Sequence, residues 1–266
     1  MTRVLAACVV LAAAASLAAQ SPVVNAVVEK RTPSGDFARD IRTVADRTTP
    51  AWIGYRVPIA RRTDAALQTY AGCCGQCRLA PPTDLVVLAR VQRGEILELR
   101  PLAVDCDMDA GGMPLIWFEP VSADASVAWL TALANAAPEA RGRTADQAQS
   151  AIGQHAGQAA AASLVRFAQS GSTTQVRGRA LVFLAQRAAD QALPTIDTAL
   201  QKDPDTEIKK LAVNALTGFP NGEGIPKLMD VARTHSNAEV RRHAMLRLGE
   251  TKDPRAIDFF TQILLK

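Results

Sequence analysis

A period of 32 residues runs through the second half of the chain and limits its architecture more than any other feature. Copies laid on this period agree at three positions, occupied in chain order by Ala148, Ala180, Ala212 and Ala244, by Ile152, Leu184, Leu216 and Leu248, and by Leu164, Ile196, Leu228 and Phe260. The first two positions lie four residues apart, a spacing that places apolar side chains on one face of a helix. Aromatic residues make up only 5 % of the chain and alanine is frequent after residue 120, which also favours close-packed helices.

Each copy is expected to contain two helices. The break between them is clearest where Asn221 and Asp253 occupy the same register as helix caps and Pro254 takes the first helical position. One helix pair cannot bury its apolar face alone, so the copies must stack into a continuous core. Residues 144–266 therefore predict an all-α solenoid of four copies.

The first helix of each copy carries a recurring motif. It is Glu207-Ile208-Lys209-x-x-Ala212-x-x-x-Leu216 in the third copy and Glu239-Val240-Arg241-x-x-Ala244-x-x-x-Leu248 in the fourth. Residues 144–266 thereby resemble HEAT or HEAT-like repeats, especially the short form of bacterial lyase-type proteins. The resemblance implies an architecture shared by scaffolds, adaptors and a few enzymes.

The first copy departs from this pattern, with Thr144 at an otherwise apolar position, and is expected to act as a capping repeat. Some proteins that resemble this family are dinuclear iron hydroxylases with His-Glu pairs on the repeats. His155, His235 and His243 have no adjacent glutamate, and no residue marks a tetrapyrrole site. Neither chemistry is therefore carried over, and no cofactor is expected.

Residues 20–140 have a mixed pattern that predicts a small β-rich module. Strands are expected at Trp52–Ile59 and Leu115–Phe118, and a hairpin from Leu85–Val91 to Glu95–Leu102. Ser122 is expected to cap a last helix, and 138–142 to form the boundary with the solenoid. The overall fold class is α+β.

The first 19 residues have the order of a secretory signal peptide. A short basic start precedes an apolar run from Val4 to Ala15 and then small residues. Leu5–Cys8 also resembles a lipoprotein cleavage box, but the apolar run continues beyond it. We expect a periplasmic or secreted protein with no transmembrane segment in the mature chain.

Four cysteines lie in the first half of the mature chain: Cys73, Cys74, Cys77 and Cys106. An even number in an exported protein favours two disulfides, with three pairings open. A four-thiolate zinc site is a weaker alternative, because only one Cys-x-x-Cys pair is present. The Cys73/Cys74/Cys77 cluster could instead support thiol-redox chemistry.

Basic residues recur at one register of the repeats. Arg177, Lys209 and Arg241 would form a ladder, with Lys210 and Arg242 beside it. The ladder either binds an acidic protein partner or has a structural role. In the structural role, its side chains bond to carbonyls and acids of the neighbouring repeat and orient the stack. The formal net charge is only +4 and basic residues are mixed with acids, so no nucleic-acid partner is expected.

Two further features are candidate sites. Asp105, Asp107 and Asp109 have the alternate spacing of a calcium loop, but Ile116 replaces the glutamate at the twelfth position. The segment is either a polar turn or an irregular calcium site. In the last helix Phe260 is expected in the core. Phe259 is expected either on an exposed apolar edge for a partner or self-association, or folded against its own repeat or onto the first domain.

These patterns favour a non-catalytic protein-binding scaffold or adaptor of the bacterial cell envelope. No Gly-x-Ser-x-Gly elbow and no phosphate-binding glycine loop occur in the sequence. The alternatives are a thiol-redox protein and a calcium-stabilised adhesive module.

Overall fold

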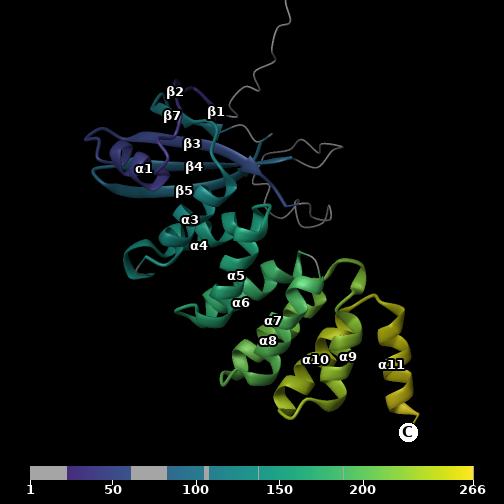
Figure 1. The fold of residues 1–266 in the computed structure, drawn as a ribbon. Coiled ribbons are helices and arrows are strands. Elements are labelled where there is room, and N and C mark those ends of the chain that lie inside the picture. Colours follow the sequence, from purple (N-terminus) through teal and green to yellow (C-terminus); the bar gives the residue numbers. More distant parts are fainter. Residues whose placement is uncertain (1–22, 61–82, 105–107, 137, 188, 266) are drawn as a thin grey trace, which may run out of the picture.

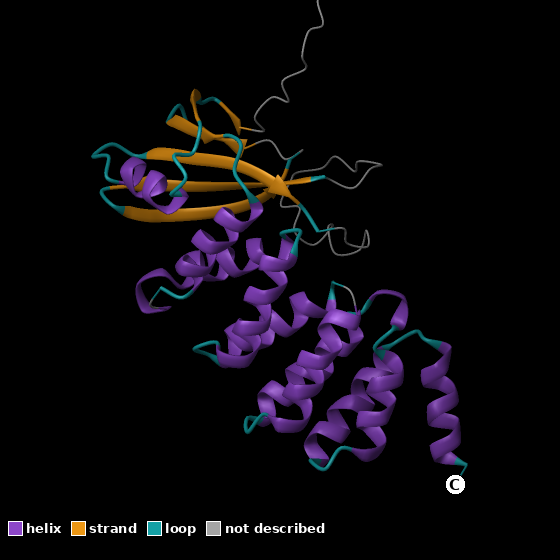
Figure 2. Cartoon of the chain, in the orientation of Figure 1, coloured by secondary structure: helices purple, strands orange, loops and turns teal. Residues whose placement is uncertain are grey.

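The computed structural model describes residues 23–60, 83–104, 108–136, 138–187 and 189–265. Strands dominate up to residue 118 and helices follow to residue 264 (Figure 2). The chain is therefore α+β, with a strand-rich first part and a helical second part.

The first part is built on a five-stranded sheet in the order β2-β7-β3-β4-β5. Its strands are β2 (Val27–Arg31), β3 (Ala51–Pro58), β4 (Asp84–Gln92), β5 (Glu95–Ala103) and β7 (Pro114–Phe118). β2 and β3 both run parallel to β7, whereas β3, β4 and β5 pair antiparallel. The strands predicted from the sequence are thus present.

The hairpin between β4 and β5 follows from its turn residues. Arg93 and Gly94 both have positive φ, 52° and 80°, as a two-residue turn between twisted antiparallel strands requires. The turn is held against the end of the helix Phe37–Ala45 (α1), because the Gly94 amide donates to the carbonyl of Ala45 at 2.8 Å.

The two faces of the sheet are covered differently. On one face α1 (Phe37–Ala45) and α3 (Ala123–Ala134) pack over apolar side chains that include Ile53 and Tyr55. On the other face Trp52 and Trp117 pack with residues of β1 (Val23–Val24) and β6 (Met108–Asp109), a short parallel pair. Strands β3, β4 and β7 are thus a buried middle layer, whereas β2 is mostly exposed.

The second part is a row of helix pairs running away from the sheet (Figure 1). Its helices are α4 (Pro138–Gln154), α5 (Gln158–Ser170), α6 (Thr174–Ala185), α7 (Ala189–Lys202), α8 (Thr206–Thr217), α9 (Ile225–Thr234), α10 (Ala238–Glu250) and α11 (Pro254–Leu264). Each 32-residue copy holds two of them, from α4–α5 to α10–α11. The stretch 138–142, expected as a boundary, is the start of α4.

Of the two caps expected from the sequence, one is present and the other is not. Asp253 caps α11, accepting from the Arg255 amide. Asn221 instead lies in a short 3₁₀ turn, η1 (Pro220–Gly222), with φ of 53°. Because this turn occupies the loop, α9 begins only at Ile225 and Gly224 is its N-cap.

The two parts share one core. α4 packs on both α3 and β5, and a single apolar cluster extends from the sheet through the helix pairs. The main chain adds two hydrogen bonds, from Ala60 to the Gln154 carbonyl at 2.8 Å and from Ala156 to the Pro58 carbonyl at 3.0 Å. In the described parts of the chain, no helix has the length and apolar character needed to cross a membrane.

Candidate protein-binding surface of the helical repeats

The basic ladder makes the same kind of contact in three successive copies. Arg177 donates to the Ala168 carbonyl at 3.2 Å, Lys209 to Gln201 at 3.5 Å, and Arg241 to His235 at 2.6 Å. Each carbonyl lies in or just after the last turn of the preceding copy's second helix. A cation is favourable there because it meets unpaired carbonyls and the negative end of the helix dipole. These contacts match the interpretation in which the ladder orients the stack.

Arg177 also forms an ion pair with Asp203, a buried carboxylate. Arg177→Met removes that partner and leaves the carboxylate uncompensated, so we expect the free energy of unfolding to fall by about 2 kcal/mol. Lys209→Met is the matched control, because its single bond is long and exposed, and its effect should stay below about 0.5 kcal/mol. Urea unfolding followed by circular dichroism measures both. Equal losses would contradict a special role for the Arg177–Asp203 pair.

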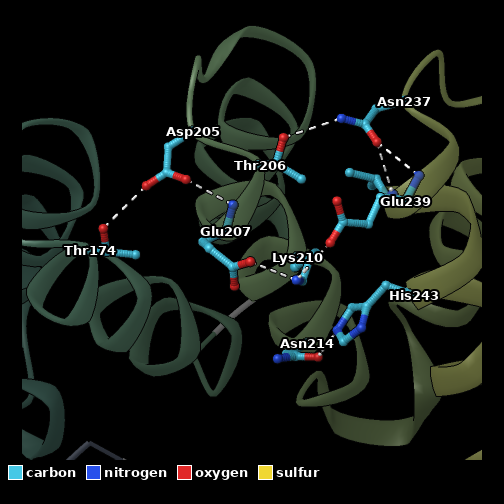
Figure 3. Close-up of polar contacts among 10 residues, drawn as sticks. Thr174, Asp205, Thr206, Glu207, Lys210, Asn214, Asn237, Glu239 and His243 are labelled. Atoms are coloured by element: carbon cyan, nitrogen blue, oxygen red, sulfur yellow. Dashed lines mark hydrogen bonds and ion pairs between the residues drawn. The ribbon is translucent and has the colours of Figure 1, made fainter.

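Lys210 links the first helices of the third and fourth copies (Figure 3). Its Nζ lies 2.6 Å from Glu207 in the same helix and 3.0 Å from Glu239 in α10. The hydrogen bonds to Glu207 and then to Glu239 raise the pKa of Lys210, and the bond from Lys210 lowers the pKa of Glu239. The junction thus places an acid of the next copy opposite a base of the previous one.

The same junction has a second polar contact, at Asn214 on α8 (Figure 3). Its Oδ1 accepts from Arg247 Nε at 2.7 Å and lies 2.8 Å from His243 Nε2. Asn214 therefore faces the first helix of the following copy.

Helix caps also connect neighbouring copies. Thr174 Oγ1 donates to the cap residue Asp205 at 3.1 Å, and the cap residue Asn237 donates to Thr206 Oγ1 at 3.2 Å. Each cap thus reaches the first residue of the preceding copy's first helix, so capping and stacking are coupled.

The last copy carries the corresponding positions without a following helix pair among the described residues. On α10, Arg242 stands where α8 has Lys210, and Leu246 stands where α8 has Asn214. Both are exposed, Leu246 by 58 %. Among the described residues, nothing covers the part of α10 that would face a next copy.

The second helix shows the same contrast. Leu228, Val231 and Ala232 are buried on α9, which packs against α10 of the next copy. Their counterparts on α11 are Phe260, which is partly buried, Ile263 at 39 % exposure and Leu264 at 82 %. Together with Ile257, which is 67 % exposed, these residues form what we call the end face: Arg242, Leu246, Ile257, Phe260, Ile263 and Leu264.

Comparison with protein families gives the same architecture. Residues 193–266 match the family described as HEAT repeats. HEAT repeats generally mediate protein–protein interactions. Searches of curated proteins and of solved structures returned no match.

Of the alternatives for Phe259, the structure shows burial and not the exposed apolar edge. Phe259 is fully buried, whereas Phe260 is only partly buried. Phe259 shares its register with the buried Ser163 and Thr195, and the Arg233 guanidinium lies 4.7 Å from its ring centroid. The exposed apolar edge exists, but its residues are those of the end face.

The cysteine and calcium predictions fall largely outside the described residues. Cys73, Cys74, Cys77, Cys106, Asp105 and Asp107 all lie there. Asp109 is described, and its Oδ1 accepts from Asn25 Nδ2 at 3.0 Å and from the Gly111 amide at 2.7 Å. Within the described ranges, no cluster of His, Cys, Asp and Glu is suited to a metal ion.

A buried polar chain that no sequence pattern predicts joins the sheet to the repeats. Tyr55 Oη lies 2.8 Å from Ser126 Oγ, which lies 3.0 Å from His155 Nε2, and all three side chains are buried. Burial raises the pKa of Tyr55. Burial, and then the positive charge of Arg187, lower the pKa of His155 to about 4. The three groups are thus held neutral and serve as a structural link between β3, α3 and the residue that follows α4.

Proposed function

We propose that the chain is a non-catalytic protein-binding scaffold or adaptor of the bacterial cell envelope, and that it binds through the end face of its last HEAT repeat. The general role of HEAT repeats supports the first statement. The signal-peptide pattern of residues 1–19 and the even number of cysteines after it support export to the periplasm or the medium, with two disulfides.

The observation that carries the proposal is the exposure of apolar residues at positions that are buried elsewhere in the repeats. Leu264 is 82 % exposed, while Ala232 at the same register is buried. Large exposed apolar patches mark interaction sites. The end face has apolar side chains at the positions that are buried between copies elsewhere, so it is suited to binding a protein.

The ladder has a smaller part in this proposal. Arg177, Lys209 and Arg241 direct their hydrogen bonds to helix ends within the solenoid. Lys210 is neutralised by two acids, whereas Arg242 remains exposed. Of these five basic residues, Arg242 is the one placed to attract an acidic group on a partner.

Affinity capture from envelope extract tests the proposal. A Leu246→Glu/Leu264→Glu variant puts charge on the end face and should reduce capture of a specific partner at least tenfold, because burying an unpaired carboxylate opposes binding. Leu97→Glu is the control, since Leu97 is 41 % exposed on β5, in the strand-rich part and away from α10 and α11. Circular dichroism verifies that both variants fold. If the end-face variant and the control capture the same proteins equally well, the end face is not the binding surface.

The alternatives rest on other residues. A thiol-redox activity would use the Cys73/Cys74/Cys77 cluster, which lies outside the described ranges. A calcium-stabilised adhesive module would use Asp105, Asp107 and Asp109, of which only Asp109 is described. Neither is favoured by a contact in the described part of the chain.

A further inference from the structure

We propose that the partner of the end face is the end face of a second copy of this chain, in a symmetric dimer with α10 antiparallel to α10 and α11 antiparallel to α11. This inference rests on the proposed function, because it takes the end face to be a binding surface and identifies its occupant.

The internal junctions define what such an occupant must provide. At the junction of α8 and α10, the next copy supplies an acid, Glu239, opposite the base Lys210. At the junction of α9 and α10, it supplies a helix over Leu228 and Val231. The end face presents a base, Arg242, and apolar side chains at these same registers. Its occupant should therefore be helical and apolar, and should carry a carboxylate near Arg242.

Head-to-tail stacking of two chains does not meet this requirement. The opposite end of the solenoid is α4, which packs against α3 and β5 and is thus covered by the strand-rich part. Among the described helices, the last pair has the largest group of exposed apolar side chains, Leu246, Ile257, Ile263 and Leu264. Two copies can therefore bury these side chains together only if the end face of one packs against the end face of the other. This is the isologous arrangement of a twofold dimer.

The charges on α10 are self-complementary in this arrangement. Arg242 and Glu250 lie four residues before and after Leu246, so all three share one face of the helix. Two α10 helices that run antiparallel and cross at Leu246 would place Arg242 of each copy beside Glu250 of the other. The twofold symmetry would thus provide each Arg242 with a carboxylate from the other copy.

The apolar residues of α11 have a matching pattern. Ile257, Phe260 and Leu264 are spaced by three and four residues, the seam spacing of paired helices. Ala256 and Phe259 lie beside these residues on the same broad apolar face and are buried. α11 therefore has one wide apolar face, of which one edge is buried and the edge with Ile257 and Leu264 is exposed. In the antiparallel pair, Ile257 of one copy would meet Leu264 of the other.

Sedimentation velocity of the full chain from about 1 to 100 µM tests the inference, because one helix pair per copy should give a dissociation constant in the micromolar range. The chain should form a dimer, and Leu264→Glu should weaken dimerisation at least tenfold. Leu97→Glu should leave it unchanged. Arg242→Glu should also weaken it, and Arg242→Glu/Glu250→Arg should restore it, because the swap re-forms both intermolecular pairs.

Three results would overturn the inference: a monomer at all concentrations, a dimer that Leu264→Glu leaves intact, or a charge swap that fails to restore a dimer lost in Arg242→Glu. If the chain is monomeric but Leu264→Glu still abolishes capture of another protein, the occupant is a different protein and the proposed function stands. If Leu264→Glu affects neither capture nor dimerisation, both proposals fail.

Discussion

Gly224→Ala is expected to lower the free energy of unfolding by about 3 kcal/mol, the upper end of the range for overpacking. A Cβ at this position would lie 2.0 Å from the backbone oxygen of Leu216 and 2.8 Å from Cδ2 of Phe219. A backbone oxygen at the end of α8 cannot move away as a side chain can. The added methyl group must therefore displace α9 from α8.

The repeat pattern alone predicts the opposite result. Ala160, Ala192 and Ala256 occupy the register of Gly224 in the other three copies, so a consensus argument would predict that alanine is tolerated. Only in the third copy does η1 bring the chain close to the preceding helix. Geometry and consensus therefore make opposite predictions here.

Urea unfolding of Gly224→Ala and of Gly249→Ala decides between them. Gly249 lies on α10, and a methyl group added there would meet no atom within 4 Å, so alanine should stabilise by about 0.5 kcal/mol through helix propensity. A Gly224→Ala protein as stable as the unchanged chain would contradict the close approach of α8 and α9.

Acid is expected to destabilise the folded chain through His155. In the unfolded chain this imidazole takes up a proton near pH 6.5, whereas in the folded chain burial beside Arg187 lowers its pKa to about 4. The unfolded state therefore binds more protons between these values, and stability falls as pH falls. The stabilisation is complete above pH 6.5, and about 3 kcal/mol of it is lost by pH 4.

Unfolding free energies at pH 7 and pH 4 for the unchanged chain and for His155→Gln isolate this contribution. The variant loses the titrating group, so its stability should fall less between the two pH values by about 3 kcal/mol, whatever the carboxylates contribute to both proteins. Identical pH dependence of the two proteins would show that His155 is not held neutral in the fold.

The sequence predicts the repeats well because their pattern is local and recurs. Copies of the same helix pair place Ala212 and Leu216 on one buried face, and the structure buries both. The β4–β5 hairpin is equally predictable from the sequence, since Arg93-Gly94 specifies its turn. In both cases residues near in sequence determine the local structure.

Other features depend on contacts between distant residues. The sequence pattern does not predict α1, although Phe37, Ile41 and Val44 have helical spacing, because a nine-residue helix is stabilised mainly by packing on the sheet. The chain of Tyr55, Ser126 and His155 leaves no sequence signal, since its members lie far apart in the sequence.

The end face shows where the repeat pattern is an incomplete guide. The pattern points to the last helix and, within it, to Phe259, the phenylalanine that replaces a lysine. The structure buries Phe259 and exposes Leu264, because the second helix of each copy turns one face toward its own repeat and another toward the next. The register of exposed residues becomes visible only when the junctions are described in three dimensions.

Amide hydrogen exchange of the bound chain, compared with the free monomer, tests most directly whether the chain binds protein through its end face. The complex is either the captured assembly or the dimer at high concentration. Binding at the end face predicts slower exchange in α10 and α11, with little change in α6 and in the five-stranded sheet. Protection confined to the sheet, or to the helices that carry Arg177 and Lys209, would contradict the account.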